Sequence, residues 1–203
     1  MDLSPDRRRA ALGHYDGTIE LLEIDSGTSA VWRAHTGAVL SVAFSPLGDK
    51  LVSGGRDRSV AVWDVATQKT LASREEHRGG VCAVAFSKNG KMIASGCAAS
   101  TIKFWKTESL MDGPVGSVSS HESAIRTLAF APDGGTLASG SEDNSVKLWN
   151  VPLAKQVASF KYKSHVRLVA FSPDGNNLAV VTDNGTLTLL RAAVLEEADR
   201  NQE

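Results

Sequence analysis

The chain has 203 residues, and its 22 lysines and arginines nearly balance its 23 aspartates and glutamates, which gives a formal net charge of −1. This balance excludes a global electrostatic attraction to nucleic acid, and the hydrophobic share of 42% excludes a disordered chain. No apolar run approaches the roughly 20 residues of a membrane-spanning helix, and the N-terminus lacks the profile of a signal peptide. We therefore expect an intracellular protein, cytoplasmic or nuclear, that does not act at a membrane.

A pattern of residues recurs five times along the chain, at intervals of 41 to 44 residues. Three copies begin at His35, His77 and His121, and each carries a Ser 18 residues and a Trp 28 residues after its His. An Asp follows the His by 22 residues in the first and third of these copies, whereas the middle copy has Ala99 there. Such a period is the signature of a repeat architecture. The shared positions are Ser53, Asp57 and Trp63, then Ser95 and Trp105, then Ser139, Asp143 and Trp149.

Two degenerate copies flank these three. In the first, Leu3 takes the position of Phe44. In the last, Phe171 sets the frame and aligns His165 with Ala38. His165 therefore lies outside the repeated His position.

Within each copy the residue pattern predicts short β-strands. In the copy that begins at His35, residues 39–44 alternate as in a half-buried strand, and residues 45–48 supply a turn. A second strand is expected near residues 50–54, and a third ends at Trp63. A less regular fourth strand follows. No helical periodicity is present before the C-terminal tail.

Together with the Trp63-Asp64 dipeptide, these offsets resemble the WD-repeat (Trp-Asp repeat) β-propeller family over residues 3 to about 190. The resemblance implies an all-β fold, a β-propeller in which four-stranded antiparallel blades surround a central channel. We expect three full blades and two partial ones, as part of a larger ring. The implied segments are a partial blade lacking its first strand at 1–34, blades at 35–76, 77–120 and 121–161, a partial degenerate blade at 162–190, and a tail at 191–203 that could be helical.

The resemblance also implies a role for the repeated polar residues. The His, Ser, Asp and Trp of a complete copy would form a buried, hydrogen-bonded relay that ties one blade together. A Ser, a His and an Asp would also suit a catalytic triad, but their recurrence at identical offsets in separate copies favours the structural role, so we expect no catalytic residue and no enzyme. The relay residues are His35, Ser53, Asp57 and Trp63; His77, Ser95 and Trp105, interrupted at Ala99; and His121, Ser139, Asp143 and Trp149.

Metal and cofactor chemistry have no support in the sequence. The chain has two cysteines, Cys82 and Cys97, and no Cys-x-x-Cys or Cys/His cluster with the spacing of metal ligands. We expect no metal, no cofactor and reduced thiols.

The two ends of the repeat pattern do not complement each other. The first copy lacks its innermost strand, and the last copy stops after its third strand at about Leu190. Because incomplete blades leave sheet edges and apolar faces uncovered, we expect a fragment of a longer propeller, in which missing blades or another chain complete the ring. The alternative is a five-bladed ring that tolerates two incomplete blades.

Resemblance to the family also points to a binding face, where the channel is narrower and where such propellers mostly bind peptides and protein surfaces. Three arginines on it, at 56, 126 and 167, suit an acidic or phosphorylated motif, because guanidinium groups pair bidentately with such anions. The alternative is that they are solvated loop charges, offset by Glu142 and Asp183. The candidate partner-binding residues are Tyr15, Leu40, Arg56, Cys82, Ala98, Arg126, Glu142, Arg167 and Asp183.

These observations predict a non-catalytic scaffold that binds peptide or protein partners as a subunit of a multiprotein complex. One alternative is a regulatory or sensor propeller severed from a larger enzyme such as a kinase or an NTPase. Another is a propeller associated with RNA processing, which rests only on the scattered arginines. With a net charge of −1, we do not expect nucleic acid to be the main partner.

Overall fold

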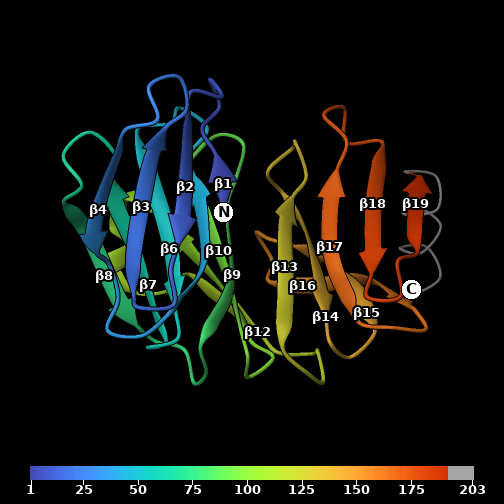
Figure 1. The fold of residues 1–203 in the computed structure, drawn as a ribbon. Helices are drawn as coiled ribbons and strands as arrows, with labels where there is room; N and C mark the ends of the chain where they lie inside the picture. The colour runs from blue at the N-terminus through green and yellow to red at the C-terminus, as the bar shows by residue number, and fades with distance from the viewer. Residues whose placement is uncertain (192–203) are drawn as a thin grey trace.

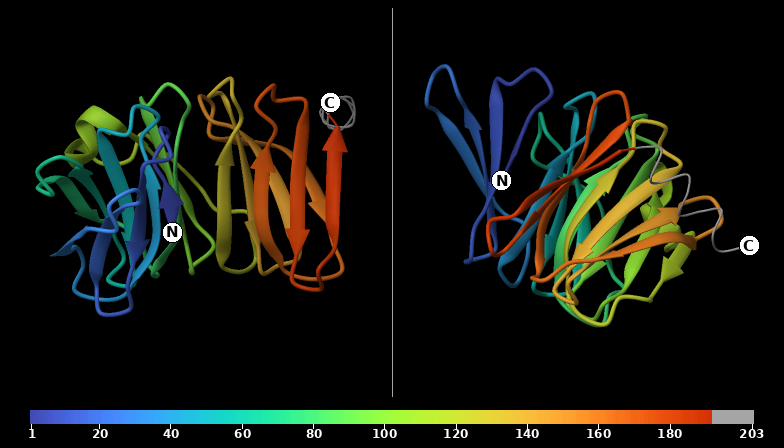
Figure 2. Two further views of the ribbon diagram at one scale, coloured as in Figure 1. Left: turned by 45° about the horizontal axis from the view of Figure 1, so that its top comes forward. Right: turned by 90° about the vertical axis from the view of Figure 1, so that its right-hand side faces the viewer.

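A computed structural model describes residues 1–191, which form five antiparallel β-sheets, four of them four-stranded and one three-stranded (Figure 1). Figure 2 shows the sheets following one another in chain order. The predicted all-β, partial-propeller architecture is therefore confirmed. None of the described residues belongs to a helix long and apolar enough to span a membrane.

Each sheet is formed by consecutive strands of one repeat. The first sheet contains β1 (Asp2–Leu3), β2 (Arg9–Gly13), β3 (Thr18–Glu23) and β4 (Ser29–Arg33). The second contains β5 (Val39–Phe44), β6 (Lys50–Gly55), β7 (Ser59–Asp64) and β8 (Thr70–Glu75). The third contains β9 (Val81–Phe86), β10 (Met92–Cys97), β11 (Ile102–Lys106) and β12 (Gly116–Val118). The fourth contains β13 (Ile125–Phe130), β14 (Thr136–Ser141), β15 (Ser145–Asn150) and β16 (Lys155–Lys161), and the fifth β17 (Val166–Phe171), β18 (Asn177–Thr182) and β19 (Leu187–Arg191).

The structure differs from the sequence pattern at two places. The first sheet has a two-residue innermost strand, β1, which pairs with β2, and the Asp2 carboxylate accepts a 2.8 Å hydrogen bond from the Phe44 backbone N–H of the next sheet. A short 3₁₀ helix, η1 (Thr107–Asp112), lies between β11 and β12 and buries Leu110. A segment this short shows no helical periodicity in the sequence. The tail expected to be helical lies, from residue 192 onward, outside the described residues.

The hydrophobic core is divided among the junctions between sheets. Buried apolar residues form four clusters, and each cluster combines residues of two consecutive sheets. No such cluster joins the first sheet to the fifth among residues 1–191. Stability therefore arises from nearest-neighbour packing along the arc, as in other repeat proteins.

A glycine in the second strand of each of the first four sheets allows this packing. These residues are Gly13, Gly54, Gly96 and Gly140, and each lies against a β-branched residue at or next to the start of the following sheet, respectively Val39, Val81, Ile125 and Val166. A Cβ built on Gly54 would lie 2.5 Å from Val81 Cγ1 and 2.8 Å from the Val81 carbonyl oxygen. The missing side chain thus leaves a hole, which we call the glycine hole, and the side chain of the next sheet fills it. Glycine is required here for space.

The fifth sheet lacks this hole, because Val181 occupies the equivalent position. On the same face, the strand pairing brings Leu168, Val181 and Leu187 into one row and Ala179 beside Leu189. On this face Leu168, Leu187 and Leu189 are 50%, 62% and 62% exposed. Within residues 1–191 the outward face of the last sheet is therefore apolar and uncovered, and it differs in shape from the four faces that receive a following sheet.

The glycine holes give a first prediction. Gly54→Ala should lower the free energy of unfolding by about 1–3 kcal/mol, because the methyl group overlaps both the side chain and the backbone of Val81. Urea unfolding of the full chain measures the change. The matched control is Gly135→Ala, where an added Cβ would lie 3.9 Å from its nearest neighbour, Asp133. Equal midpoints for the two variants would contradict the packing role.

Candidate functional site

Two blades contain a continuous chain of buried polar side chains. In the second sheet the Trp63 indole N–H donates to Ser53 Oγ over 2.8 Å, and Ser53 Oγ lies 2.7 Å from His35 Nε2. His35 Nδ1 lies 3.0 Å from a carboxylate oxygen of Asp57. The fourth sheet has the same arrangement in His121, Ser139, Asp143 and Trp149, with distances of 2.8, 2.7 and 2.7 Å along the chain.

Charge fixes the direction of these hydrogen bonds. Burial acts to raise the pKa of Asp143, but hydrogen bonds from Ser145, from the Glu122 backbone and from His121 outweigh it and lower the pKa to about 2. The carboxylate is therefore ionised at neutral pH and only accepts hydrogen bonds. His121 must then donate from Nδ1 and accept from the Ser139 hydroxyl at Nε2. Burial also lowers the pKa of His121, which favours this neutral form.

The relay carboxylates hold the loops at one end of the channel. Asp57 accepts a hydrogen bond from the Thr36 backbone N–H over 2.9 Å, and Asp143 accepts one from the Glu122 N–H over 2.9 Å. Asp57 and Asp143 lie in the turn after the second strand of their sheets, and Thr36 and Glu122 lie just before the first strand. Each of these hydrogen bonds therefore connects the two loops. The turn that contains Asp143 also carries Glu142, so the relay positions a residue of the predicted binding face.

In the third sheet the relay is incomplete. His77 Nε2 lies 2.7 Å from Ser95 Oγ, which accepts the Trp105 indole N–H over 2.8 Å, as in the intact blades. Ala99 replaces the Asp, and the buried His77 Nδ1 has no hydrogen-bond partner within residues 1–191. Burial, with a smaller contribution from the charge of Lys103, lowers the pKa of His77 to about 4.

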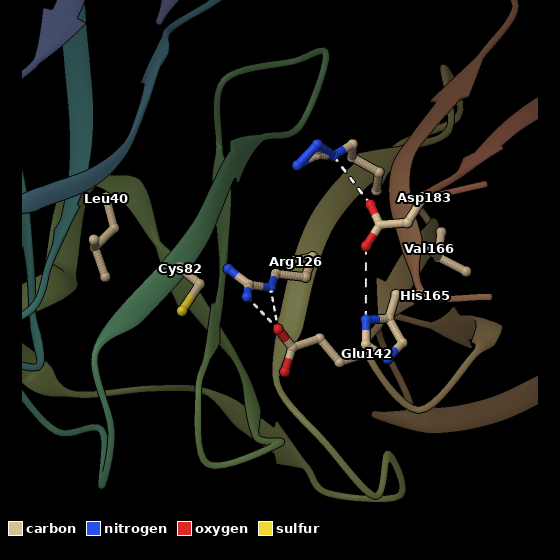
Figure 3. A pocket seen from close by; sticks show the side chains of 8 residues that line it. Leu40, Cys82, Arg126, Glu142, His165, Val166 and Asp183 are labelled. Atoms are coloured by element: carbon tan, nitrogen blue, oxygen red, sulfur yellow. Dashed lines mark hydrogen bonds and ion pairs between the residues drawn. The ribbon is translucent and has the colours of Figure 1, made fainter. Parts of the chain in front are cut away.

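A cavity of about 370 Å³ opens among the inner strands of the second to fifth sheets. Figure 3 shows Leu40 and Cys82 on one side of it and the charged side chains on the other. We call this space the channel-face cavity. Its lining residues are Leu40, Cys82, Arg126, Glu142, His165, Val166, Arg167 and Asp183.

The arginines of the channel-face cavity already have carboxylate partners. Arg126 pairs with Glu142 through two nitrogens, with Nε 2.7 Å from the carboxylate, and Arg167 Nε lies 3.1 Å from Asp183. Two of the three predicted arginines therefore line one cavity, where Glu142 and Asp183 offset their charges. An anion that binds here would compete with Glu142 and Asp183 for these guanidinium groups.

Not every predicted face residue lies in this cavity. Tyr15 is 91% exposed and, like Arg56 and Ala98, does not line it. Arg56 lies nearby, with its Cα 3.3 Å from where a Cβ of Gly80 would stand, and it forms no ion pair in the described part of the chain. The cavity thus collects six of the predicted residues and leaves Arg56 as an unpaired cation beside it.

Sequence reasoning did not place two residues of the cavity, His165 and Val166. His165 was set aside because it does not occupy the relay position, yet its ring Nδ1 lies 3.6 Å from Asp183. The sequence signal for its place in the cavity was its alignment with Ala38, which lies two residues before the predicted face residue Leu40.

The remaining wall of the cavity is less polar. Leu40 contributes aliphatic surface, and the Cys82 thiol donates a hydrogen bond to the Gly80 carbonyl over 3.3 Å. Burial raises the pKa of Cys82, so the thiol stays protonated and unreactive at neutral pH. Across residues 1–191 no cluster of three or more His, Cys, Asp or Glu side chains could hold a metal ion.

Parts of the chain are similar to known proteins. The family model described as "IFT122 first beta-propeller" matches residues 38–202. A 47-residue segment, 23% of the chain, is 43% identical to the "Ribosome biogenesis protein BOP1 homolog" of Drosophila melanogaster, of which it covers 6%. A 67-residue segment, 32% of the chain, is 33% identical to the mouse "WD repeat and FYVE domain-containing protein 1", of which it covers 16%. The chain thus matches only a small part of each relative.

The interrupted relay gives a pH-dependent prediction. As the pH falls, His77 takes up a proton near pH 6.5 in the unfolded chain but only near pH 4 in the folded protein, so the free energy of unfolding should decrease over this interval, by up to about 3 kcal/mol. Ala99→Asp should reduce this decrease, because a carboxylate would stabilise the protonated imidazole.

Urea unfolding across this pH interval, on the wild type and on Ala99→Asp, measures the difference. Ala98→Asp is the matched control, since it adds the same charge one residue away, on the neighbouring exposed side chain. The same pH dependence in all three proteins would contradict the assignment of the missing relay partner.

Proposed function

The chain belongs to the WD-repeat β-propeller family, through its match to the model of the IFT122 first beta-propeller, and from this membership we propose that it is a non-catalytic scaffold. It binds protein partners on the face that carries the channel-face cavity, as a subunit of a multiprotein complex. Domains of this family are generally non-catalytic platforms. We place its action in the cytoplasm or the nucleus.

The single observation that supports this function is the convergence of four sheets on one polar cavity. Leu40, Cys82 and Arg126 occupy equivalent positions near the start of the first strand in successive sheets. A repeated fold thus presents different side chains at equivalent points around one opening. Such a surface suits recognition of an irregular peptide or loop, because each blade offers a separate contact.

We further propose that the bound segment is acidic or phosphorylated. Its anionic group replaces Glu142 or Asp183 on an arginine, and the unpaired Arg56 adds a net positive charge beside the cavity. Exchange of one carboxylate for another yields little net energy at an exposed site. Net affinity therefore comes from Arg56 and from burial of aliphatic surface against Leu40, which is 39% exposed, and we expect a reversible contact.

The exposed face of the last sheet supports a second part of this proposal. Leu168, Leu187 and Leu189 are exposed along it, which a protein that acts in water does not ordinarily leave uncovered. Further blades or another chain would cover this face and complete the ring. Val181 stands where the other sheets have the glycine. The contact between this face and whatever covers it therefore differs from the four contacts between consecutive sheets.

A second candidate is a role in RNA processing. It is favoured by one observation, the 43% identity over 47 residues to a ribosome biogenesis protein. That likeness covers only 6% of the relative, and a shared blade is compatible with many partners. The salt dependence of RNA binding separates this candidate from the scaffold, since contacts to phosphates weaken steeply as the salt concentration rises.

An array of acidic, phosphoserine-containing and basic peptides, with fluorescence polarisation on those selected, tests the scaffold proposal. We expect acidic or phosphorylated peptides to be selected. Arg126→Gln should weaken their binding by about tenfold, which corresponds to about 1.4 kcal/mol, because it leaves the Glu142 carboxylate unpaired in the cavity, where it repels an anionic peptide. Glu142→Gln should strengthen binding, because Arg126 is then unpaired.

Arg58→Gln is the matched control. Arg58 is also paired with a glutamate, Glu75, and its side chain is 53% exposed, as is that of Arg126, but it lies away from the channel-face cavity. Binding should not change in this variant. Selection of basic peptides, or equal losses in Arg58→Gln and Arg126→Gln, would overturn the proposal. Binding of RNA alone, with a strong salt dependence, would favour the second candidate instead.

A further inference from the structure

A second cavity, of about 320 Å³, lies beside the interrupted relay and apart from the channel-face cavity. His77 lines it, and only 5% of this residue is exposed. We call this space the His77 cavity. Its lining residues are Glu76, His77, Arg78, Thr101, Lys103, Ser117 and Ser119.

The intact blades show what this cavity lacks. In the second sheet, Asp57 accepts hydrogen bonds from the ring of His35, from the backbone N–H of Thr36 and from the backbone N–H and hydroxyl of Ser59. Asp143 accepts the corresponding hydrogen bonds in the fourth sheet. Each carboxylate therefore accepts these four hydrogen bonds from three residues, and Asp57 accepts a further one from the Thr36 hydroxyl over 3.3 Å.

In the third sheet the donors are present without the acceptor. His77 Nδ1 is buried and has no partner in the described part of the chain. Arg78 and Thr101 correspond in position to Thr36 and Ser59. Within residues 1–191 their backbone N–H groups donate no hydrogen bond. The Thr101 hydroxyl turns instead to the Ala99 carbonyl, 3.2 Å away.

The charge of the cavity matches this deficit. The corresponding cavity beside His35 is lined by two cations, Arg33 and Arg58, and two anions, Asp57 and Glu75, so its formal charge is zero. The His77 cavity is lined by Arg78 and Lys103 and by a single carboxylate, Glu76.

Glu76 does not compensate for the missing anion. Its carboxylate lies 2.6 Å from Arg74 and 3.8 Å from Lys103, so it is already paired. The His77 cavity therefore has one positive charge in excess, which one bound carboxylate would neutralise.

We propose that the His77 cavity is a carboxylate-binding site, in which the carboxylate of an Asp or Glu side chain from a partner, or a free small carboxylate, takes the place that Asp57 and Asp143 hold in the other blades. The anion accepts hydrogen bonds from His77 Nδ1 and from the N–H groups of Arg78 and Thr101. The relay of the third blade is then completed by a ligand. This site does not depend on the channel-face cavity.

Thermal unfolding of the full chain at neutral pH tests the site, with sodium formate as the probe and sodium chloride at the same ionic strength as the reference. Formate should raise the melting temperature of the wild type by about 2–4 °C at saturation. Ala99→Asp should melt higher than the wild type without formate, and formate should add nothing to it. Ala98→Asp, the matched control, should keep the response of the wild type.

A titration followed by amide NMR on the wild type avoids reliance on variants. Saturable shifts of the Arg78 and Thr101 amide resonances with formate, absent with chloride, support the site. A short Asp-containing peptide that produces the same shifts identifies the ligand as a side chain, and a response to formate alone identifies a small carboxylate. No formate-specific shift, or the same response to formate in Ala99→Asp, would overturn the proposal.

Discussion

The hydrogen bond between a buried imidazole and an ionised carboxylate is the constraint on which this structure depends. An indole, a hydroxyl and an imidazole are buried in each central blade, and a buried polar group without a partner is costly. Asp57 and Asp143 end these chains, and they also bind the backbone of the loops at the channel face. The same carboxylates therefore satisfy the blade interior and fix the loop positions from which a partner is recognised.

The relay could be predicted from the sequence because its residues recur at fixed offsets, and those offsets resemble the ones that form such a relay in the WD-repeat family. His121, Ser139 and Trp149 stand at the spacings of their counterparts in the earlier copies, and the structure joins them by hydrogen bonds. Convergence of Arg126 and Arg167 on one opening also follows from the repeat, since equivalent positions of successive blades surround the channel. The repeat and its offsets were thus readable from the sequence, whereas the propeller architecture and the binding face were expected from the resemblance of those offsets to the WD-repeat family.

What the sequence could not supply depends on contacts between copies. The pairing of Arg126 with Glu142 is set by side-chain conformation, and the role of Gly54 becomes visible only when Val81 of the next sheet is packed against it. His165 occupies no relay position, so its place in the cavity follows from strand geometry. The missing acceptor at Ala99 could be read from the sequence, whereas the cavity and the excess charge beside it could not.

Amide hydrogen exchange of the wild-type chain tests most directly whether the relay carboxylates hold the face. The N–H groups of Thr36 and Glu122 donate to Asp57 and Asp143, whereas that of Arg78, at the same position in the third blade, has no acceptor within residues 1–191. After correction for intrinsic rates, we expect the Arg78 amide to exchange at least about tenfold faster than the other two. Equal exchange at all three positions would contradict the account.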